Sequence, residues 1–375
     1  MAFPREEYDW RLGKARALMN THGVDIMLAD CAELMTWLTG YAPSETMYRV
    51  VLLPKDGEPV YVLRKLDEDP CRRNNLVARI VTFEDHEEPQ LAIAGVLRLL
   101  GMEKARIGVD FNSYSFTVRS YRRLMELLPQ AVFVDLPDAS DAFRWIKSGR
   151  EVEQLAAAAA IADKAMGAIA HDIRAGMSPR DAAAIAARTY LLEGADTGEV
   201  GPIVRSSGGH EFLHGGLGND RLQDGDILHV ELIPKIAHYC ARLMRPIFIG
   251  QPSREMDETA RMLISLQDQQ IAEMKSGAIA SQVDAILRQG LLKSGLRDAF
   301  PNVTAYTLGI YNRTPRSSDF SRVLLPTSDW PLETGMVFHL YASAQGLGFS
   351  ETVVVTEDGG RRLTQFERML LSSQA

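Results

Sequence analysis

The chain has 375 residues, of which 46% are hydrophobic and 24% charged, and this is the composition of a soluble globular protein long enough for two domains. Its formal net charge of −8, without a basic stripe, argues against a nucleic-acid partner. The N-terminus is charged from the fifth residue and no apolar run approaches membrane-spanning length, so we expect a cytoplasmic protein without a signal peptide or a membrane partner. Cys31, Cys71 and Cys240 form no CxxC pair, which favours reduced thiols.

The first 145 residues alternate between helix and strand patterns. Apolar residues recur at helical spacing over residues 5–22, and Gly23 ends this helix. Short strand-like runs such as DIMLAD and RVVLLP are followed by helical stretches at 88–100 and 117–128. This alternation predicts one α/β domain over residues 1–145.

One loop of this domain, WLTGYAPSETMYR, joins a helix to a strand through glycine, proline and serine. Loops of this kind carry function more often than the elements that they connect. Tyr48 and Arg49, at the end of the loop, are therefore candidates for contacting a ligand. The alternative is an exposed tyrosine and arginine on the edge of a strand.

The second part of the chain, residues 151–375, contains a repeat. A shift of 101 residues places Arg174 on Lys275 and Gly176 on Gly277, and in each copy a pair of helices is followed by a pair of strands. A unit used twice predicts an α+β domain with a pseudo-twofold axis, a curved antiparallel sheet and helices on one side. A site is expected in the concavity of the sheet. Chance similarity between two alanine-rich helices is the alternative.

The central stretch of this domain concentrates ionisable side chains. Alternating apolar residues predict a half-buried strand with His229 and Glu231 on one face. A second apolar run over 239–249 predicts a hairpin that brings Arg242 near Glu231. A histidine, a carboxylate and a guanidinium on one sheet face are the components of a catalytic pocket, and the alternative is a polar cluster around an ion pair.

Several motifs resemble those of the creatinase, aminopeptidase P and prolidase family. The segment HGGLGNDRLQDGDILHVE is similar to the family's run from a histidine-glycine pair to a strand that ends in a ligand residue. The segments LETGMVFHLY and GLGFSETVVVTEDGG are similar to its last two strands. The resemblance covers residues 151–367 and, more loosely, the N-terminal domain. It implies a creatinase-type N-terminal domain, a pita-bread C-terminal domain and a homodimer.

Peptidases of this family hold two divalent metal ions with two aspartates, one histidine and two glutamates, and this chain departs from that set. The first aspartate falls on Glu231, the second on Arg242 and the first glutamate on Tyr341. The last glutamate falls on Ser350 or, with a slip of one residue, on Glu351. The segment that supplies the histidine falls on YTLGI, which contains none.

This substitution pattern decides the expectation about a metal cofactor. A guanidinium has no lone pair to offer a metal ion and its charge repels one. We therefore expect no dinuclear centre and no cofactor. A single metal ion bound by Glu231, His214 and His339 is the alternative.

The loss of these ligands resembles the creatinase and ectoine hydrolase branch, which implies metal-independent hydrolysis of a C–N bond in a small amidine, guanidino or related zwitterionic compound. Our hypothesis is that His214 takes a proton from water and returns it to the leaving nitrogen. Glu231 and Glu351 would hold the cationic group of the substrate. Arg242 would orient Glu231 or bind a substrate carboxylate, and His229 would support Glu231.

Two further residues, His339 and Tyr341, share a strand face and are expected to line the same pocket; a core histidine is the alternative for His339. The long loop 312–330 predicts a lid or a dimer contact. Within it, Arg313 and Arg316 either recognise an anionic group or lie on the surface.

Other functions stay open at this point. One is a metal-dependent Xaa-Pro dipeptidase or aminopeptidase. Another is a non-catalytic pita-bread protein that binds a small molecule or a peptide. A lyase acting on a small zwitterion would differ from the hydrolase only in its product.

Overall fold

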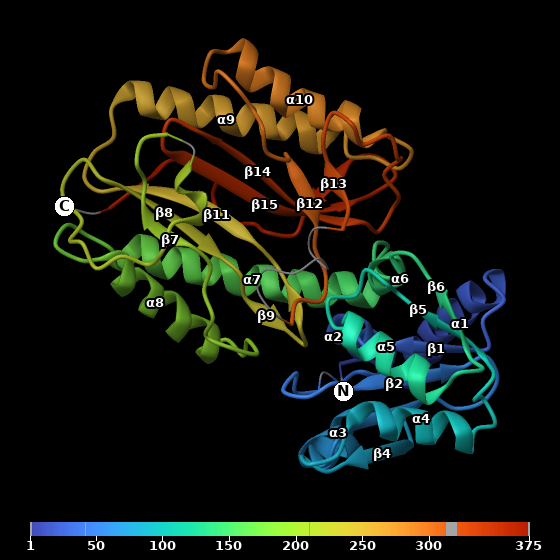
Figure 1. Ribbon diagram of the computed structural model, residues 1–375. Coiled ribbons are helices and arrows are strands. Elements are labelled where there is room, and N and C mark those ends of the chain that lie inside the picture. The colour runs from blue at the N-terminus through green and yellow to red at the C-terminus, as the bar shows by residue number, and fades with distance from the viewer. Residues whose placement is uncertain (1, 42, 210, 313–320, 374–375) are drawn as a thin grey trace. The chain divides into compact units, whose positions relative to one another are not determined.

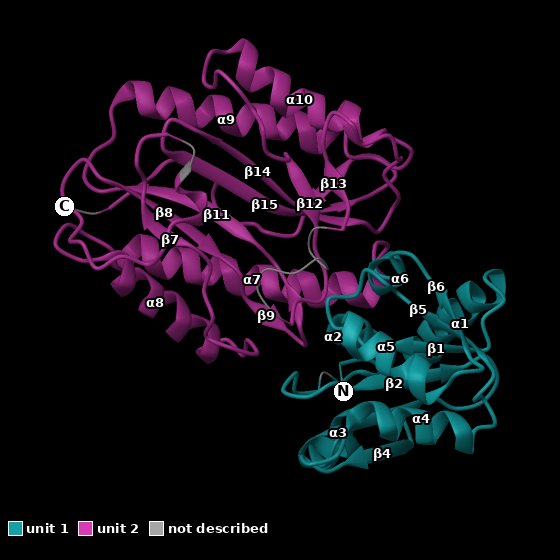
Figure 2. Ribbon diagram, viewed as in Figure 1, with its two compact units in different colours: residues 1–144 teal, residues 145–375 magenta. Residues whose placement is uncertain are grey.

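The computed structural model describes residues 2–41, 43–209, 211–312 and 321–373. The chain divides into two compact units, residues 1–144 and 145–375, here called unit 1 and unit 2 (Figure 2). Arg313 and Arg316 lie outside the described residues. Among the helices within those ranges, none combines the length and the apolar character needed to cross a bilayer.

Unit 1 is built on a mixed six-stranded sheet in the order β4-β3-β2-β1-β5-β6 (Figure 1). Its strands are β1 (Ile26–Ala29), β2 (Val50–Pro54), β3 (Val60–Arg64), β4 (Arg79–Phe83), β5 (Arg106–Val109) and β6 (Val132–Asp135). Its helices are α1 (Arg5–Thr21), α2 (Ala32–Thr39), η1 (Lys65–Asp67), α3 (Glu68–Asn74), α4 (Pro89–Leu99), α5 (Val118–Leu127) and α6 (Ala139–Ala142). The predicted alternation of helices and strands is confirmed, and Gly23 follows α1 with a positive φ of 61°.

Unit 2 is built on a nine-stranded sheet whose main path runs β13-β12-β14-β15-β11-β8-β7. Its strands are β7 (Ile203–Arg205), β8 (Ile227–Leu232), β11 (Leu243–Phe248), β12 (Ala305–Thr307), β13 (Val323–Leu324), β14 (Val337–Ala344) and β15 (Leu347–Val355), with β16 (Gly360–Arg362) and β17 (Leu371–Ser372) beside β15 and β11. Its helices are α7 (Gly149–Asp172), α8 (Pro179–Leu192), η2 (Glu211–His214), α9 (Arg254–Ala272) and α10 (Ala280–Lys293).

The predicted repeat is confirmed. The pair α7 and α8 precedes the paired strands β8 and β11, and the pair α9 and α10 precedes the paired strands β14 and β15. The local sequence explains where these helices begin: Ser178 caps α8 by accepting a hydrogen bond from the backbone N–H of Asp181, and Pro179 occupies the first turn. The two strand pairs meet at the junction of β11 with β15.

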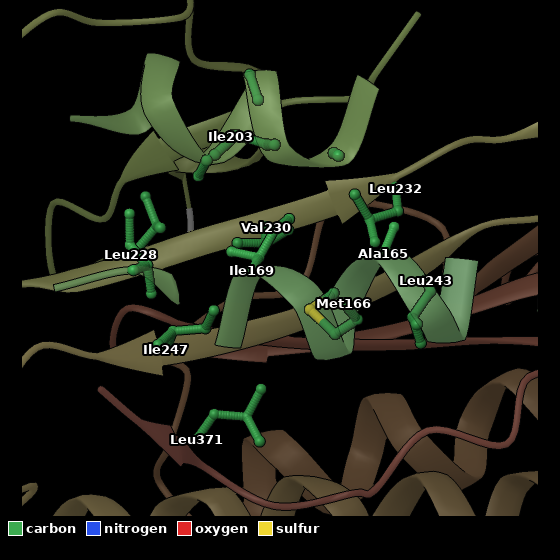
Figure 3. Packing of buried hydrophobic residues seen from close by; sticks show 14 of the residues in the cluster. Ala165, Met166, Ile169, Ile203, Leu228, Val230, Leu232, Leu243, Ile247 and Leu371 are labelled. Atoms are coloured by element: carbon green, nitrogen blue, oxygen red, sulfur yellow. The ribbon is translucent and has the colours of Figure 1, made fainter. Parts of the chain in front are cut away.

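One side of this sheet is covered by helices. Leu228, Val230 and Leu232 alternate along β8 and pack with Met166 and Ile169 of α7 in a buried apolar cluster (Figure 3). Since side chains alternate along a strand, the residues between them lie on the opposite side of the sheet. We call the side packed against the helices the helix face and the opposite side the site face.

The hairpin predicted around Arg242 differs in detail from the one observed. The second long strand begins at Leu243, and the run before it folds into a small separate ribbon in which β10 (Tyr239–Cys240) pairs with β9 (Lys235–Ile236). Ala237 and His238 turn this ribbon with positive φ angles. Arg242 therefore lies in the link between β10 and β11.

Candidate functional site

A row of side chains crosses the site face at the centre of the sheet. Met244 on β11 pairs with Glu231 on one side and with Ser350 on the other, and Ser350 pairs in turn with Tyr341. Paired residues of antiparallel strands point to the same face. The register therefore places Glu231, Ser350 and Tyr341 together, three of the positions at which the resemblance expects metal ligands.

Glu231 forms an ion pair that the sequence predicted. Arg242 Nη1 donates to Glu231 Oε1 at 2.8 Å, and Glu231 is only 2% exposed. Burial raises the pKa of Glu231, while the charges of Arg242 and His214 act in the opposite direction. The carboxylate thus has a fixed cation from its own chain and an imidazole within electrostatic reach.

The Arg242 side chain is held between aromatic rings. Its Cζ lies 5.5 Å from the ring centres of both Tyr306 and Tyr311, and Nη2 lies 3.5 Å from the Tyr311 hydroxyl. Its backbone is fixed by Thr352, whose Oγ1 accepts from the Arg242 N–H and donates to the Arg242 carbonyl, both at 2.8 Å. Neither tyrosine was expected from the sequence to contact Arg242, although Tyr306 begins the YTLGI segment and Tyr311 follows it directly.

His339 lies on the site face two residues before Tyr341. It is completely buried, and its Nδ1 forms a 2.8 Å hydrogen bond with the Tyr306 hydroxyl. Burial lowers the pKa of His339, and the charge of Arg242 contributes in the same direction. His339 is therefore a neutral imidazole bonded to a phenol, and the backbone carbonyl expected for a core histidine is not its partner.

The 3-10 turn η2 carries His214, which is exposed. Phe212 of the same turn packs edge-on against His229, with 5.0 Å between the ring centres. His229 is completely buried, and burial lowers its pKa to about 3. Neither ring nitrogen of His229 has a hydrogen-bond partner among the described residues, so the expected support of Glu231 by His229 is not observed.

Glu351 requires a correction. It pairs with Leu340, and alternation along β15 places it on the helix face, away from Glu231. There it is completely buried and accepts a hydrogen bond from Arg245 Nη2 at 2.8 Å. The expectation that Glu231 and Glu351 hold one cationic group is therefore wrong, and Ser350 occupies the corresponding position on the site face.

Tyr48 and Arg49 belong to unit 1, where both have internal partners. The Tyr48 hydroxyl donates to Asp30 Oδ2 at 2.9 Å, and Arg49 Nη1 donates to the Asp30 carbonyl at 3.2 Å. Arg49 is buried, so the alternative of an exposed arginine on a strand edge is wrong. A ligand-binding role for the two residues stays a prediction.

The donor set on the site face does not fit a pair of divalent ions. Such ions need several anionic oxygen ligands, but Tyr341 and Ser350 are neutral and Glu231 is already paired with Arg242. Within the described parts of the chain, no three His, Cys, Asp or Glu side chains are grouped so that they could hold one ion. Glu231, His214 and His339 therefore do not form such a group. The arrangement instead offers imidazole, carboxylate and guanidinium groups for acid–base and electrostatic chemistry.

Comparison with known proteins agrees with this fold. Residues 153–357 match the metallopeptidase family M24, and residues 11–146 match the creatinase/prolidase N-terminal domain. The chain is 25% identical over 393 residues to an ectoine hydrolase from Halomonas elongata, covering 99% of this chain and 98% of that protein. It is 23% identical over 370 residues to an Xaa-Pro dipeptidase from Pyrococcus horikoshii, covering 96% and 98%.

Solved structures show the same architecture. The prolidase from Thermococcus sibiricus superposes with a TM-score of 0.84 at 23% identity, covering 97% of this chain and 99% of that one. The dipeptidase from Mycobacterium ulcerans superposes with a TM-score of 0.82 at 23% identity over the full length of both chains. The chain therefore belongs to the M24 family and combines a creatinase-type N-terminal domain with a pita-bread C-terminal domain.

Proposed function

We propose that this protein is a hydrolase that cleaves a C–N bond in a small amidine, guanidino or related zwitterionic compound without a metal ion. The observation that carries the proposal is the ion pair between Glu231 and Arg242. It places a permanent cation where the family's peptidases have a metal ligand. The similarity to an ectoine hydrolase over nearly the full length of both chains supports the same chemistry.

In the proposed mechanism, His214 is the general base. It is exposed on η2, where substrate and water can reach it, and its charge interacts with Glu231. His214 takes a proton from water, which attacks the amidine or guanidino carbon, and then returns the proton to the leaving nitrogen. Glu231 stabilises the imidazolium formed in the first step, and Arg242 fixes the orientation of Glu231.

The assembly and partners belong to the same proposal. We infer a homodimer that acts on a small molecule, with no nucleic-acid or membrane partner and no cofactor. The acidic net charge is consistent with the absence of a nucleic-acid partner.

Two alternatives have specific support. Relatives named Xaa-Pro dipeptidase favour a metal-dependent peptidase. The replacement of the acidic ligands favours a non-catalytic protein that binds a small molecule or a peptide. The peptidase predicts bound metal ions. The binding protein predicts no turnover that the substitution His214→Ala could remove.

The test combines one substitution with metal analysis. Ectoine, creatine and glycyl-proline are tried as substrates, and binding is measured by thermal shift. His214→Ala should lower kcat by about 10²–10⁴-fold with ligand affinity retained, because it removes only proton transfer. His171→Ala is the matched control, since that histidine is 79% exposed on α7. Turnover should also survive EDTA.

Three outcomes would decide against the proposal. Two equivalents of manganese, cobalt or zinc together with cleavage of glycyl-proline would establish the peptidase. Ligand binding without turnover in the wild type would indicate a binding protein. Unchanged kcat in His214→Ala would remove the proposed base.

A further inference from the structure

Arg297 is a buried cation on the segment between α10 and β12. It is 5% exposed and forms no ion pair with a carboxylate among the described residues. Its Nε donates to the Ala299 carbonyl at 3.1 Å, Nη2 lies 3.5 Å from Asn302 Oδ1, and Nη1 has no hydrogen-bond acceptor in the described parts of the chain. A guanidinium does not lose its proton in a protein, so this charge stays inside unit 2 without a counterion among the residues that the structure describes.

Arg288, on the preceding helix α10, shows how a structural arginine is satisfied next to the same ring. Both guanidinium groups lie over Phe300, with Cζ 4.8 Å from the ring centre for Arg288 and 4.1 Å for Arg297. Arg288 also donates to the two carboxylate oxygens of Asp284, at 2.6 and 2.8 Å. Arg297 has the ring contact, the Ala299 carbonyl and Asn302, but no carboxylate partner among the described residues. Phe300 therefore holds the Arg297 guanidinium in place, but no carboxylate of the described ranges neutralises it.

The charge of Arg297 acts on the site face through Tyr341. Burial raises the pKa of Tyr341 to about 12; Asn302 and Arg297 lower it, whereas Glu231 raises it. Tyr341 is thus a neutral phenol on the site face that interacts electrostatically with Arg297 and Glu231, and Asn302 contacts both Tyr341 and Arg297. Glu231 and Arg242 neutralise one another. Of the described charged groups that act on Tyr341, Glu231 pairs with Arg242 and Arg288 pairs with Asp284, which leaves Arg297 as the charge without an ionic partner there.

We propose that Arg297, which is linked to Tyr341 through Asn302, binds a carboxylate group of the substrate. Guanidinium and carboxylate form the charge-assisted hydrogen bonds that would satisfy Nη1 and supply the counterion. The inference rests on the proposed function and narrows it. The substrate carries an anionic group at the Tyr341 end of the site and its scissile C–N bond at the end near His214 and Glu231.

The first test uses acetate, which needs no turnover and so stands apart from the hydrolase assay. The melting temperature is measured in sodium acetate and in sodium chloride of equal ionic strength. Acetate should raise the melting temperature of the wild type and of the control Arg254→Gln, whose side chain is 91% exposed on α9. It should not raise that of Arg297→Gln, and Arg297→Lys, which keeps the charge, should respond partly.

The second test uses a compound that binds the wild type, compared with its primary amide. Removal of Arg297 should cost the acid about tenfold or more in affinity and leave the amide unchanged, because only the acid pairs with the guanidinium. Arg297→Met should fold and melt no lower than the wild type, since it removes an uncompensated buried charge. The proposal is overturned by an equal acetate response in Arg297→Gln, by no response in the wild type, or by failure of Arg297→Met to fold.

Discussion

The two faces of the unit 2 sheet each bury a glutamate, and they treat it differently. On the helix face, Glu351 accepts a hydrogen bond from Arg245 and lies 3.1 Å from Arg368 Nε and 3.6 Å from Arg362 Nη1. The hydroxyl of Thr364 donates to its second oxygen. Glu351 is thus enclosed by cations and a donor that all belong to the fold.

On the site face, Glu231 has a single arginine partner among the described residues, and several neighbouring polar atoms have none. Both ring nitrogens of His229, Nε2 of His339 and the hydroxyl of Ser350 are buried without a hydrogen-bond partner in the described chain. Buried polar groups are normally paired. The difference indicates that the helix face uses its polar groups for stability, whereas the site face keeps hydrogen-bonding capacity for a ligand.

The largest effect is expected on the helix face. Glu351→Gln leaves three arginines without their shared carboxylate in a buried environment, so the free energy of unfolding should fall by about 3–5 kcal/mol. Urea unfolding followed by circular dichroism measures this loss. Glu258→Gln, which breaks the exposed 2.8 Å pair with Arg254, should change little. A loss no larger than in this control would mean that Glu351 does not stabilise the fold.

Much of the architecture could be predicted from the sequence, because hydrophobic periodicity and the repeat in residues 151–375 specify helices, strands and their order. The proximity of Glu231 and Arg242 also followed from the strand pattern. The side of the sheet on which Glu351 lies could not be predicted in this way. A slip of one residue moves a side chain across the sheet, and the choice between Ser350 and Glu351 depends on the pairing of Ser350 with Tyr341.

Arg297 shows a second limit of the sequence. Whether an arginine after a helix is buried depends on the path of the following loop, here through Phe300 and Asn302. No periodic pattern specifies that path. The lack of a carboxylate partner within the described chain is likewise a property of spatial neighbours, which explains why anion recognition was predicted at Arg242, Arg313 and Arg316 instead.

The expected effect on stability at a third buried carboxylate, Asp30 in unit 1, lies between the effects at Glu351 and at His229. Its oxygens accept from the hydroxyls of Tyr48 and Ser113, and burial raises its pKa from 3.8 to about 6. The folded state therefore binds a proton more tightly than the unfolded state. The resulting stability is fully present below pH 3.8 and is lost as pH rises to about 6, a difference of about 3 kcal/mol.

The variant Asp30→Asn removes this titration. The unfolding free energy of the wild type minus that of Asp30→Asn should fall by about 2.4 kcal/mol between pH 4 and pH 7, as measured by urea unfolding at each pH. Asp9→Asn, at an exposed position on α1, serves as the control. A difference for Asp30→Asn that does not change between pH 4 and pH 7 would show that burial does not raise the pKa of this carboxyl group.

The smallest effect is expected at His229 on the site face. An unpaired buried polar group costs about 1–3 kcal/mol, so His229→Leu, which removes both nitrogens at similar volume, should leave the unfolding free energy unchanged or raise it by about 1 kcal/mol at pH 7. Ser328→Ala is the control in the same unit, because the Ser328 hydroxyl is satisfied by the Val323 carbonyl at 2.8 Å. That substitution should destabilise the protein.

The pH dependence of the unfolding free energy gives a further test of the buried His229 ring. Burial lowers the pKa of His229 to about 3, so the folded state keeps the ring neutral while the unfolded state takes up a proton near pH 6.5. Stability from the neutral ring is present above pH 6.5 and is lost as pH falls, and the advantage of His229→Leu over the wild type should therefore grow below pH 6.5. A His229→Leu variant less stable than Ser328→Ala at pH 7 would mean that the imidazole is satisfied within the fold, and the contrast between the two faces would then fail at this position.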